Sequence, residues 1–179
     1  MSSRAQTIIC SQMAVVVEGS AVKLEAPALA RKHMKYVLII LALLGITASA
    51  LALREKYRPY GESPCDINDR WDCGIVNHSP YAVWPKGSEH GIPVAVIGIA
   101  GYLLLGVLAF FRRYGLMLIL SVPALAFALY LAHVEEHVLG VWCLYCAISL
   151  GTISLMTLLL VITVIVRSLR RKPAPAMSA

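Results

Sequence analysis

Charge is scarce in this chain of 179 residues, since aspartate, glutamate, lysine and arginine together make up 15% of it, against roughly 25% in an average soluble domain. Four stretches contain no charged residue at all: 36–53, 91–111, 114–132 and 138–166. None of them shows the polar stripe of helical period that helices of a soluble bundle carry. The lack of charge and of such a stripe argues against a soluble helical domain.

The lengths of these stretches, which are 18, 21, 19 and 29 residues, suit a lipid bilayer. A hydrocarbon core about 30 Å thick is crossed by roughly 20 apolar residues in a helix, and a short apolar run satisfies its backbone amides in lipid only as a helix. The sequence therefore predicts an all-α membrane protein, a bundle of four transmembrane helices with a long extracytoplasmic loop between the first two. The spans are placed at about 36–53, 91–111, 114–133 and 140–166, and the loop at 54–90.

The first stretch has one alternative interpretation, a cleaved signal peptide. Basic residues precede it, and Ala48, Ser49 and Ala50 resemble a signal-peptidase site. However, the apolar region of a signal peptide runs for about 7–15 residues at the N-terminus, whereas this one is longer and starts after 35 residues. A retained first helix is favoured, and cleavage would leave three spans without changing the side that the loops face.

Basic residues are unevenly distributed, and eleven of the sixteen fall on one side of the predicted spans. They are Arg4, Lys23, Arg31, Lys32, Lys35, Arg112, Arg113, Arg167, Arg170, Arg171 and Lys172. Because lysine and arginine are retained in the cytoplasm, we expect a protein of the inner (cytoplasmic) membrane with a cytoplasmic arm 1–35, a transmembrane domain 36–167 and a cytoplasmic tail 168–179. The net charge of +6 is then an orientation signal, and nothing indicates a nucleic-acid partner.

The five cysteines sort by side of the membrane. Cys10 falls in the cytoplasmic arm, where thiols stay reduced, and no role is predicted for it. The other four fall at the outer face, with Cys65 and Cys73 in the long loop and Cys143 and Cys146 at the start of the last span. Even numbers of cysteines in an oxidising compartment usually form structural disulfides, so a non-enzymatic scaffold with two stable disulfides is one interpretation.

The second pair favours redox chemistry over a structural bridge. Cys143 and Cys146 form a C-x-x-C motif, and residues three apart share one face of a helix. A helix N-terminus favours thiolate over thiol, and the thiolate is the nucleophile in disulfide exchange. A bridge that closes so small a loop contributes little stability. Two dithiols on the same side of a membrane therefore indicate a thiol oxidoreductase.

A metal site is a third interpretation. His133 and His137 lie four residues apart, six residues before Cys143, and two histidines with two cysteines could complete a tetrahedral zinc site. The same string matches the H-x-x-E-H pattern of some zinc proteases, but that pattern belongs to a soluble helix with a distal third ligand. A polar turn that caps the third and fourth spans is the commoner interpretation, so no metal ligand is predicted.

The chain resembles the vitamin K epoxide reductase family and its bacterial thiol-oxidising homologues over roughly residues 36–167. The matching features are Cys65 and Cys73 with seven residues between them, Ser79 six residues later, and Cys143-x-x-Cys146 at the start of the last span. The number and order of spans match as well. The resemblance implies that the domain 36–167 is catalytic and that its cofactor is a membrane quinone, ubiquinone or menaquinone.

The resemblance also implies a role for each cysteine. Cys146 is expected to face the quinone, Cys143 to exchange with Cys73, and Cys65 to meet the thiol partner. Ser79 is expected to donate a hydrogen bond to a quinone carbonyl oxygen. The partner is expected to be a separate periplasmic thioredoxin-fold oxidase, since a thioredoxin-fold domain is fused in many homologues and does not follow the fourth span here.

Two positions depart from the vertebrate pattern. Vertebrate members carry a tyrosine four residues after the last cysteine and an asparagine at the start of the second span, where this chain has Leu150 and Val94. Both positions are expected to border the quinone. Their apolar side chains fit an enzyme that passes electrons to membrane quinone better than one that reduces vitamin K epoxide.

Overall fold

The structure, a computed structural model, describes residues 26–59, 61–88 and 90–171. Contacts between residues divide the chain into two compact units, up to Val37 and from Leu38 onward. The described part of the first unit is the start of helix α2, which spans Ala26–Lys56. The predictions for Cys10, for most of the N-terminal arm and for the end of the tail lie outside the described residues.

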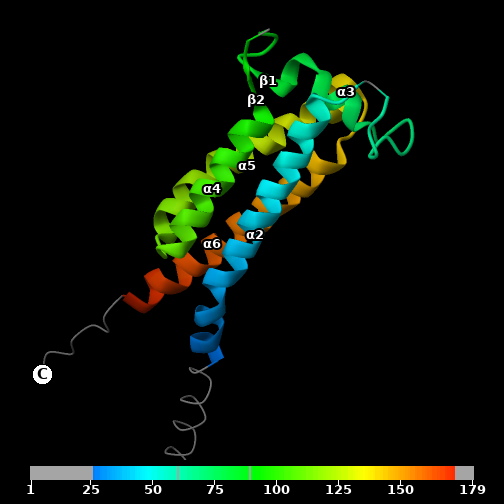
Figure 1. Cartoon of the computed structure of the whole chain (residues 1–179). Coiled ribbons are helices and arrows are strands. Elements are labelled where there is room, and N and C mark those ends of the chain that lie inside the picture. The colour runs from blue at the N-terminus through cyan, green and yellow to red at the C-terminus, as the bar shows by residue number, and fades with distance from the viewer. Residues whose placement is uncertain (1–25, 60, 89, 172–179) are drawn as a thin grey trace, which may run out of the picture. The chain divides into compact units, whose positions relative to one another are not determined.

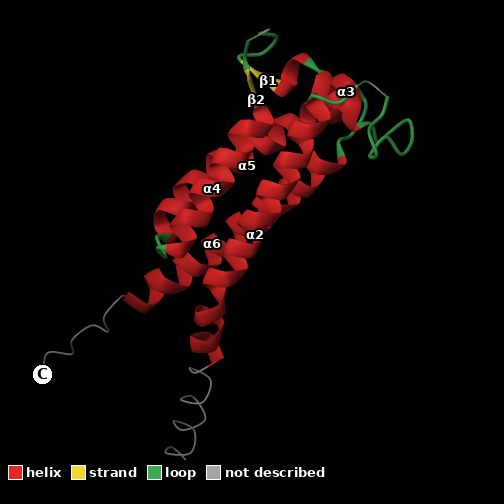
Figure 2. Cartoon of the chain, viewed as in Figure 1, coloured by secondary structure: helices red, strands yellow, loops and turns green. Residues whose placement is uncertain are grey.

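The second unit contains four apolar helices (Figures 1 and 2). They are the remainder of α2, α4 (Val94–Phe110), α5 (Tyr114–Val134) and α6 (Leu144–Arg171). Within the described ranges, three helical segments are long and apolar enough to cross a membrane: His33–Lys56, Tyr114–Leu139 and Leu144–Ser168. Helix α4 is equally apolar but has 17 residues. The predicted all-α fold with four apolar helices is confirmed.

Small residues allow α2 to approach α4. Gly45 of α2 lies against the ring of Tyr102 so closely that a Cβ atom there would overlap it, and Gly98 of α4 lies against Ser49 of α2. The hydroxyl of Tyr102 donates to the carbonyl of Ser149 in α6 at 2.8 Å. Because there is no hydrophobic driving force between helices in lipid, their association depends on close packing of this kind.

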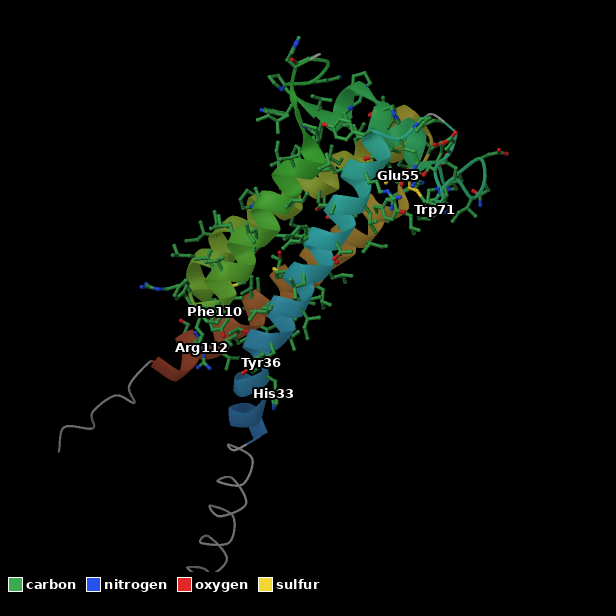
Figure 3. The ribbon with its side chains drawn as sticks, viewed as in Figure 1. His33, Tyr36, Glu55, Trp71, Phe110 and Arg112 are labelled. Carbon is green, nitrogen blue, oxygen red and sulfur yellow. A yellow bond between two sulfur atoms is a disulfide. The ribbon has the colours of Figure 1, made fainter. Side chains whose placement is uncertain are left out.

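The two ends of the second unit differ in what they carry. Figure 3 shows Phe110 and Arg112 at one end and Glu55 and Trp71 at the other. The first end is the tight turn between α4 and α5, where Arg112 adopts a φ of 56°. The second end carries the segment between α2 and α4, which we call the α2–α4 segment, together with the connection from α5 to α6.

The α2–α4 segment contains more regular structure than a plain loop. It includes helix α3 (Cys73–His78), the 3₁₀ turn η1 (Pro80–Ala82) and strand β1 (Val83–Trp84), which pairs antiparallel with β2 (Ile92–Pro93) just before α4. Sequence patterns did not predict these short elements.

The connection from α5 to α6 is also helical where a polar turn was expected. Helix α5 continues into a π-helix, η2 (Glu135–Leu139). Gly140 follows with a φ of 69°, a conformation that glycine adopts without strain. This residue turns the chain toward Trp142 and the start of α6.

Candidate active site

The α2–α4 segment is joined to the start of α6 by a short run of backbone hydrogen bonds. The amide of Trp142 donates to the carbonyl of Arg70 at 2.8 Å, and the amide of Asp72 donates to the carbonyl of Trp142 at 3.1 Å. Trp71 and Trp142 form a parallel bridge, with ring centroids 6.3 Å apart. Cys143 follows Trp142 directly, and Cys73 follows Trp71 by two residues.

Side chains fasten the same junction. The guanidinium of Arg70 lies 3.1 Å from a carboxylate oxygen of Glu136 in η2, and the indole N–H of Trp142 donates to the other oxygen of that carboxylate. We call Arg70, Trp71, Glu136 and Trp142 the clasp. The clasp holds the α2–α4 segment against the α5–α6 connection.

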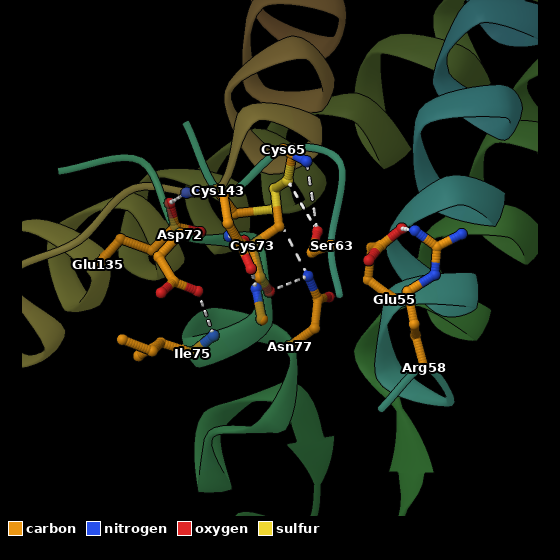
Figure 4. Close-up of a disulfide and its surroundings, with 12 residues drawn as sticks. Glu55, Arg58, Ser63, Cys65, Asp72, Cys73, Ile75, Asn77, Glu135 and Cys143 are labelled. Atoms are coloured by element: carbon orange, nitrogen blue, oxygen red, sulfur yellow. Dashed lines mark hydrogen bonds and ion pairs between the residues drawn. A yellow bond between two sulfur atoms is a disulfide. The ribbon is translucent and has the colours of Figure 1, made fainter. Parts of the chain in front are cut away.

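Four cysteines lie close to one another next to the clasp. Cys65 and Cys73, the loop pair, form a disulfide with Cα atoms 5.8 Å apart, whereas Cys143 and Cys146, the helix pair, are free thiols. Cys65, Cys73 and Cys143 share one buried cluster, at 2%, 0% and 0% exposure, and Cys146 packs against it. Figure 4 shows Cys143 beside the disulfide. The loop pair, which the sequence places in a long outer loop, is therefore enclosed.

Carboxylates of the α2–α4 segment hold Cys73 at the first residue of α3. Asp72 is the N-cap, and its side chain accepts from the amide of Ile75 at 2.7 Å. Asp66 accepts from the amides of Cys73 at 3.0 Å and Gly74 at 3.3 Å. These bonds satisfy amides that a helix start leaves without a partner.

Asn77 connects the two pairs. Its side-chain amide donates to the carbonyl of Cys73 at 2.8 Å and to the sulfur of Cys143 at 3.6 Å. The pKa of the Cys143 thiol is lowered, chiefly by a hydrogen bond from the Cys146 side chain and further by Asn77, while burial and the charge of Glu135 act against this shift. The hydrogen bonds therefore favour the thiolate, the reactive form of Cys143.

Glu135 also contacts the helix pair. Its carboxylate accepts from the amide of Cys143 at 3.0 Å and is hydrogen-bonded with the side chain of Cys146. The residue is 3% exposed. Glu135 is thus the acidic group in direct contact with both cysteines of the motif.

A cavity of about 380 Å³ opens beside Cys146 among α2, α4, α5 and α6. Its lining is mostly apolar and includes all four positions expected to border a quinone, namely Ser79, Val94, Cys146 and Leu150. Binding sites for small molecules are typically apolar cavities of about 300–1,000 Å³ with a few polar groups. The volume and the apolar lining of this cavity are in the range expected for a quinone head group.

Ser79 borders this cavity with its hydroxyl already engaged. The hydroxyl donates to the carbonyl of Val76 at 2.7 Å and so caps the end of α3. To donate to a quinone oxygen, as its position suggests, the hydroxyl has to rotate away from Val76. In the geometry described, it offers the cavity only an acceptor.

Comparison with known proteins agrees with this geometry. The chain matches the sequence profile of the vitamin K epoxide reductase family over residues 36–164. The chain belongs to that family. The family consists of quinone-dependent thiol oxidoreductases, so this protein is a multi-pass membrane enzyme that transfers electrons between thiols and quinones. No individual curated protein matches it.

Membership of the vitamin K epoxide reductase family sets aside the scaffold interpretation of the cysteines. The zinc interpretation gains no support from the described residues, in which no three histidine, cysteine, aspartate or glutamate side chains are placed to share a metal ion. The rings of His133 and His137 instead stack on each other, with centroids 4.3 Å apart.

Several polar residues of this site were not predicted from the sequence. Asp72 carried a signal, since an aspartate before a short helix is a common N-cap. Asn77 carried another, because it follows Cys73 by four residues and so shares its helix face. Glu135 was assigned to a polar turn, and nothing in the local sequence distinguishes it from its neighbour Glu136.

Proposed function

We propose that this enzyme oxidises the dithiol of a separate thioredoxin-fold partner on the outer side of the membrane and delivers the electrons to membrane quinone. The partner's dithiol reduces the Cys65–Cys73 disulfide. Cys73 then attacks Cys143 of the oxidised helix pair, and the electrons pass to that pair. Finally, Cys143 and Cys146 return to a disulfide as they reduce a quinone to quinol. The net result is one new disulfide in the partner and one quinol in the membrane.

The observation that supports this scheme best is the shared buried cluster of Cys65, Cys73 and Cys143. Exchange between two disulfides requires a thiolate of one to reach a sulfur of the other. The bridge of Trp71 with Trp142 holds the chain just before Cys73 beside the chain just before Cys143, and Cys146 borders the apolar cavity. The cysteines therefore form a continuous series from the α2–α4 segment to the cavity.

The orientation follows from charge. With eleven of sixteen basic residues on the side of the termini, the end that carries the cysteines faces outward. The domain limits predicted from sequence, 36–167 with terminal arms on the cytoplasmic side, remain part of the proposal. The direction of electron flow follows from reduction potentials. The potential of a quinone pool lies well above those of dithiol–disulfide pairs, and for two electrons each 30 mV of difference corresponds to about 1.4 kcal/mol.

The decisive experiment adds a short-chain ubiquinone or menaquinone to the reduced, purified protein and follows quinol formation. Wild type is expected to form quinol, and Cys146→Ala is expected to form none. Equal rates in the two proteins would remove Cys146 from the site next to the quinone. A wild-type protein that forms no quinol with either compound would contradict the proposed function.

The partner is tested by trapping. In Cys73→Ala, Cys65 is a free thiol whose thiolate can attack the disulfide of the oxidised partner, the reverse of the proposed reaction. This breaks the partner's disulfide and forms a mixed disulfide, which Cys73 is no longer present to resolve, so it should accumulate in cells. Cys65→Ala is the matched control, since it lacks the cysteine proposed to meet the partner. A mixed disulfide with a thioredoxin-fold protein in the first variant alone supports the scheme. Equal trapping in both would contradict the role of Cys65.

A further inference from the structure

Two adjacent glutamates at the start of η2 have different environments. Glu136 is partly exposed and paired with Arg70 and Trp142 of the clasp. Glu135 is 3% exposed and points toward the helix pair, where it accepts from the amide of Cys143. A π-helical turn begins at this residue, and such turns occur frequently at functional sites.

Among the described residues, Glu135 has no ion-pair partner. Of the groups able to ionise, Cys146 of α6 borders the same cavity, as do Lys56, Tyr81, Tyr102 and Tyr145. Cys143 contacts Glu135 through its amide, and His78 belongs to α3, which packs against η2. Cys73 of α3 is held in the disulfide. No ion pair between Glu135 and any of these groups is present among the described residues, whereas Arg58 pairs with Glu55 and Arg70 pairs with Glu136. An ionised carboxylate without water or a counter-ion gains free energy by taking up a proton.

We propose that Glu135 is a catalytic proton acceptor, which takes the proton of the Cys146 thiol when the helix pair is oxidised and passes it to the reduced quinone. The inference rests on the proposed function. Its geometric basis is threefold. Glu135 contacts the side chain of Cys146, its carboxylate is oriented by the amide of Cys143, and it borders the cavity assigned to the quinone.

Electrons and protons balance in this step. Oxidation of the dithiol breaks the S–H bond of Cys146, forms one S–S bond and transfers two electrons to the quinone, which takes up two protons. One proton travels from Cys146 through Glu135 to a quinone oxygen. Cys143 reacts as its thiolate, the form that its lowered pKa favours; its proton goes to solvent, and the quinol takes up the second proton from solvent.

The first test needs no quinone. Reduced wild type, Glu135→Gln and the control Glu62→Gln, which alters an exposed carboxylate of the α2–α4 segment, are alkylated with iodoacetamide across a range of pH, and each cysteine is quantified by mass spectrometry. Because the charge of Glu135 opposes the Cys143 thiolate, the alkylation midpoint of Cys143 should shift to lower pH in Glu135→Gln only. An unchanged midpoint would mean that Glu135 carries no charge in the dithiol state, and an uncharged acid cannot accept the proton.

The second test is a single turnover of the same reduced proteins with a short-chain quinone. Loss of a general base typically slows a step by about 10²–10⁴-fold, so we expect quinol formation in Glu135→Gln to be roughly 100-fold slower near neutral pH. The deficit should shrink as pH rises, because solvent then removes the thiol proton. A deficit of equal size at every pH indicates a purely structural role and overturns the proposal, as does a wild-type rate in Glu135→Gln.

Two further outcomes keep the test decisive. If Glu135→Gln does not fold, the pH profile of wild type still decides, since a proton acceptor requires the rate to rise through a titration on the acid side, and a flat profile would exclude one. If wild type itself forms no quinol, the proposed function fails. If wild type and Glu135→Gln both form quinol at the same rate, only the role of Glu135 is contradicted.

Discussion

The loop pair and the helix pair are both enclosed, but different forces hold them. Cys143 and Cys146 stand at the start of α6, a helix of 28 residues packed along α5. Cys65 and Cys73 pack in a small buried cluster with Cys143, and their segment is otherwise held by hydrogen bonds, by a six-residue helix and by an ion pair whose side chains are 68% and 37% exposed. Regions with few buried apolar contacts open at a lower free-energy cost than packed helices.

This difference fits a division of labour. In the proposed reaction a thiol partner in water has to reach Cys65, which is 2% exposed, so the α2–α4 segment would have to open in each cycle. The helix pair can remain fixed beside the cavity, where the approach of a quinone requires constant geometry. The weaker attachment of the loop pair is therefore a property that the reaction needs.

The largest expected effect is a difference in the number of quinols that each cysteine variant forms per chain. Fully reduced wild type holds two dithiols and should form two quinols per chain from excess quinone. Cys143→Ala should form essentially none, slowed by about 1,000-fold or more as expected for loss of a nucleophile. Cys65→Ala retains the helix pair and should form one. The measurement is the amplitude of quinol absorbance under anaerobic conditions, and one full quinol from Cys143→Ala would contradict a series that ends at the helix pair.

A smaller effect is expected at Asn77, the residue that contacts both pairs. Asn77→Ala removes a hydrogen bond to the Cys143 sulfur, and bonds to charged groups contribute about 1.5–3 kcal/mol. Since that bond favours the thiolate, its loss should raise the pKa of Cys143 and move the alkylation profile of this cysteine to higher pH. Exchange with the loop pair near neutral pH should slow by roughly tenfold.

The measurement for Asn77→Ala is pH-dependent alkylation of Cys143 in the reduced protein, with Cys65 as the internal reference. The shift has the opposite sign to the one expected for Glu135→Gln, because one residue donates to the thiolate and the other repels it. Shifts of the same sign in both variants would indicate a general loosening of the site. That result would contradict the electrostatic account of Cys143.

The sequence predicted the helices well because lipid imposes a simple requirement on them. Every residue from Tyr114 to Ala132 is uncharged, and α5 begins at Tyr114. The end of the first helix was predicted at Leu53, and α2 continues to Lys56 because basic and acidic side chains are tolerated beyond the hydrocarbon. The length of an apolar stretch reflects the thickness of the membrane, so it can be read without knowing the tertiary contacts.

The structure around the cysteines was less predictable because its causes lie far apart in the sequence. Helix α3 has only six residues, too few to be stable alone, and depends on Asp66 and on packing against η2. The burial of Glu135 likewise depends on Cys143, eight residues later, and on the π-helical turn. A single sequence contains these residues but does not show that they lie close together in space.

The smallest expected effect concerns the clasp. Arg70→Ala removes an exposed ion pair, and such pairs contribute about 0.2–1 kcal/mol, so opening of the α2–α4 segment should become roughly twofold to fivefold more frequent. The measurement is the rate at which iodoacetamide modifies reduced Cys65 and Cys73. Glu136→Gln should have a similar or larger effect, because it also weakens the bond to Trp142.

The double variant decides whether the clasp acts as a pair. If Arg70 and Glu136 stabilise the closed segment through their mutual contact, Arg70→Ala should add little to Glu136→Gln, since the partner charge is already gone. Fully additive rates would show that each residue acts separately. Unchanged rates in all three variants would mean that the α2–α4 segment is held by the backbone bridge between Trp71 and Trp142, and that the loop pair is no easier to open than the helix pair.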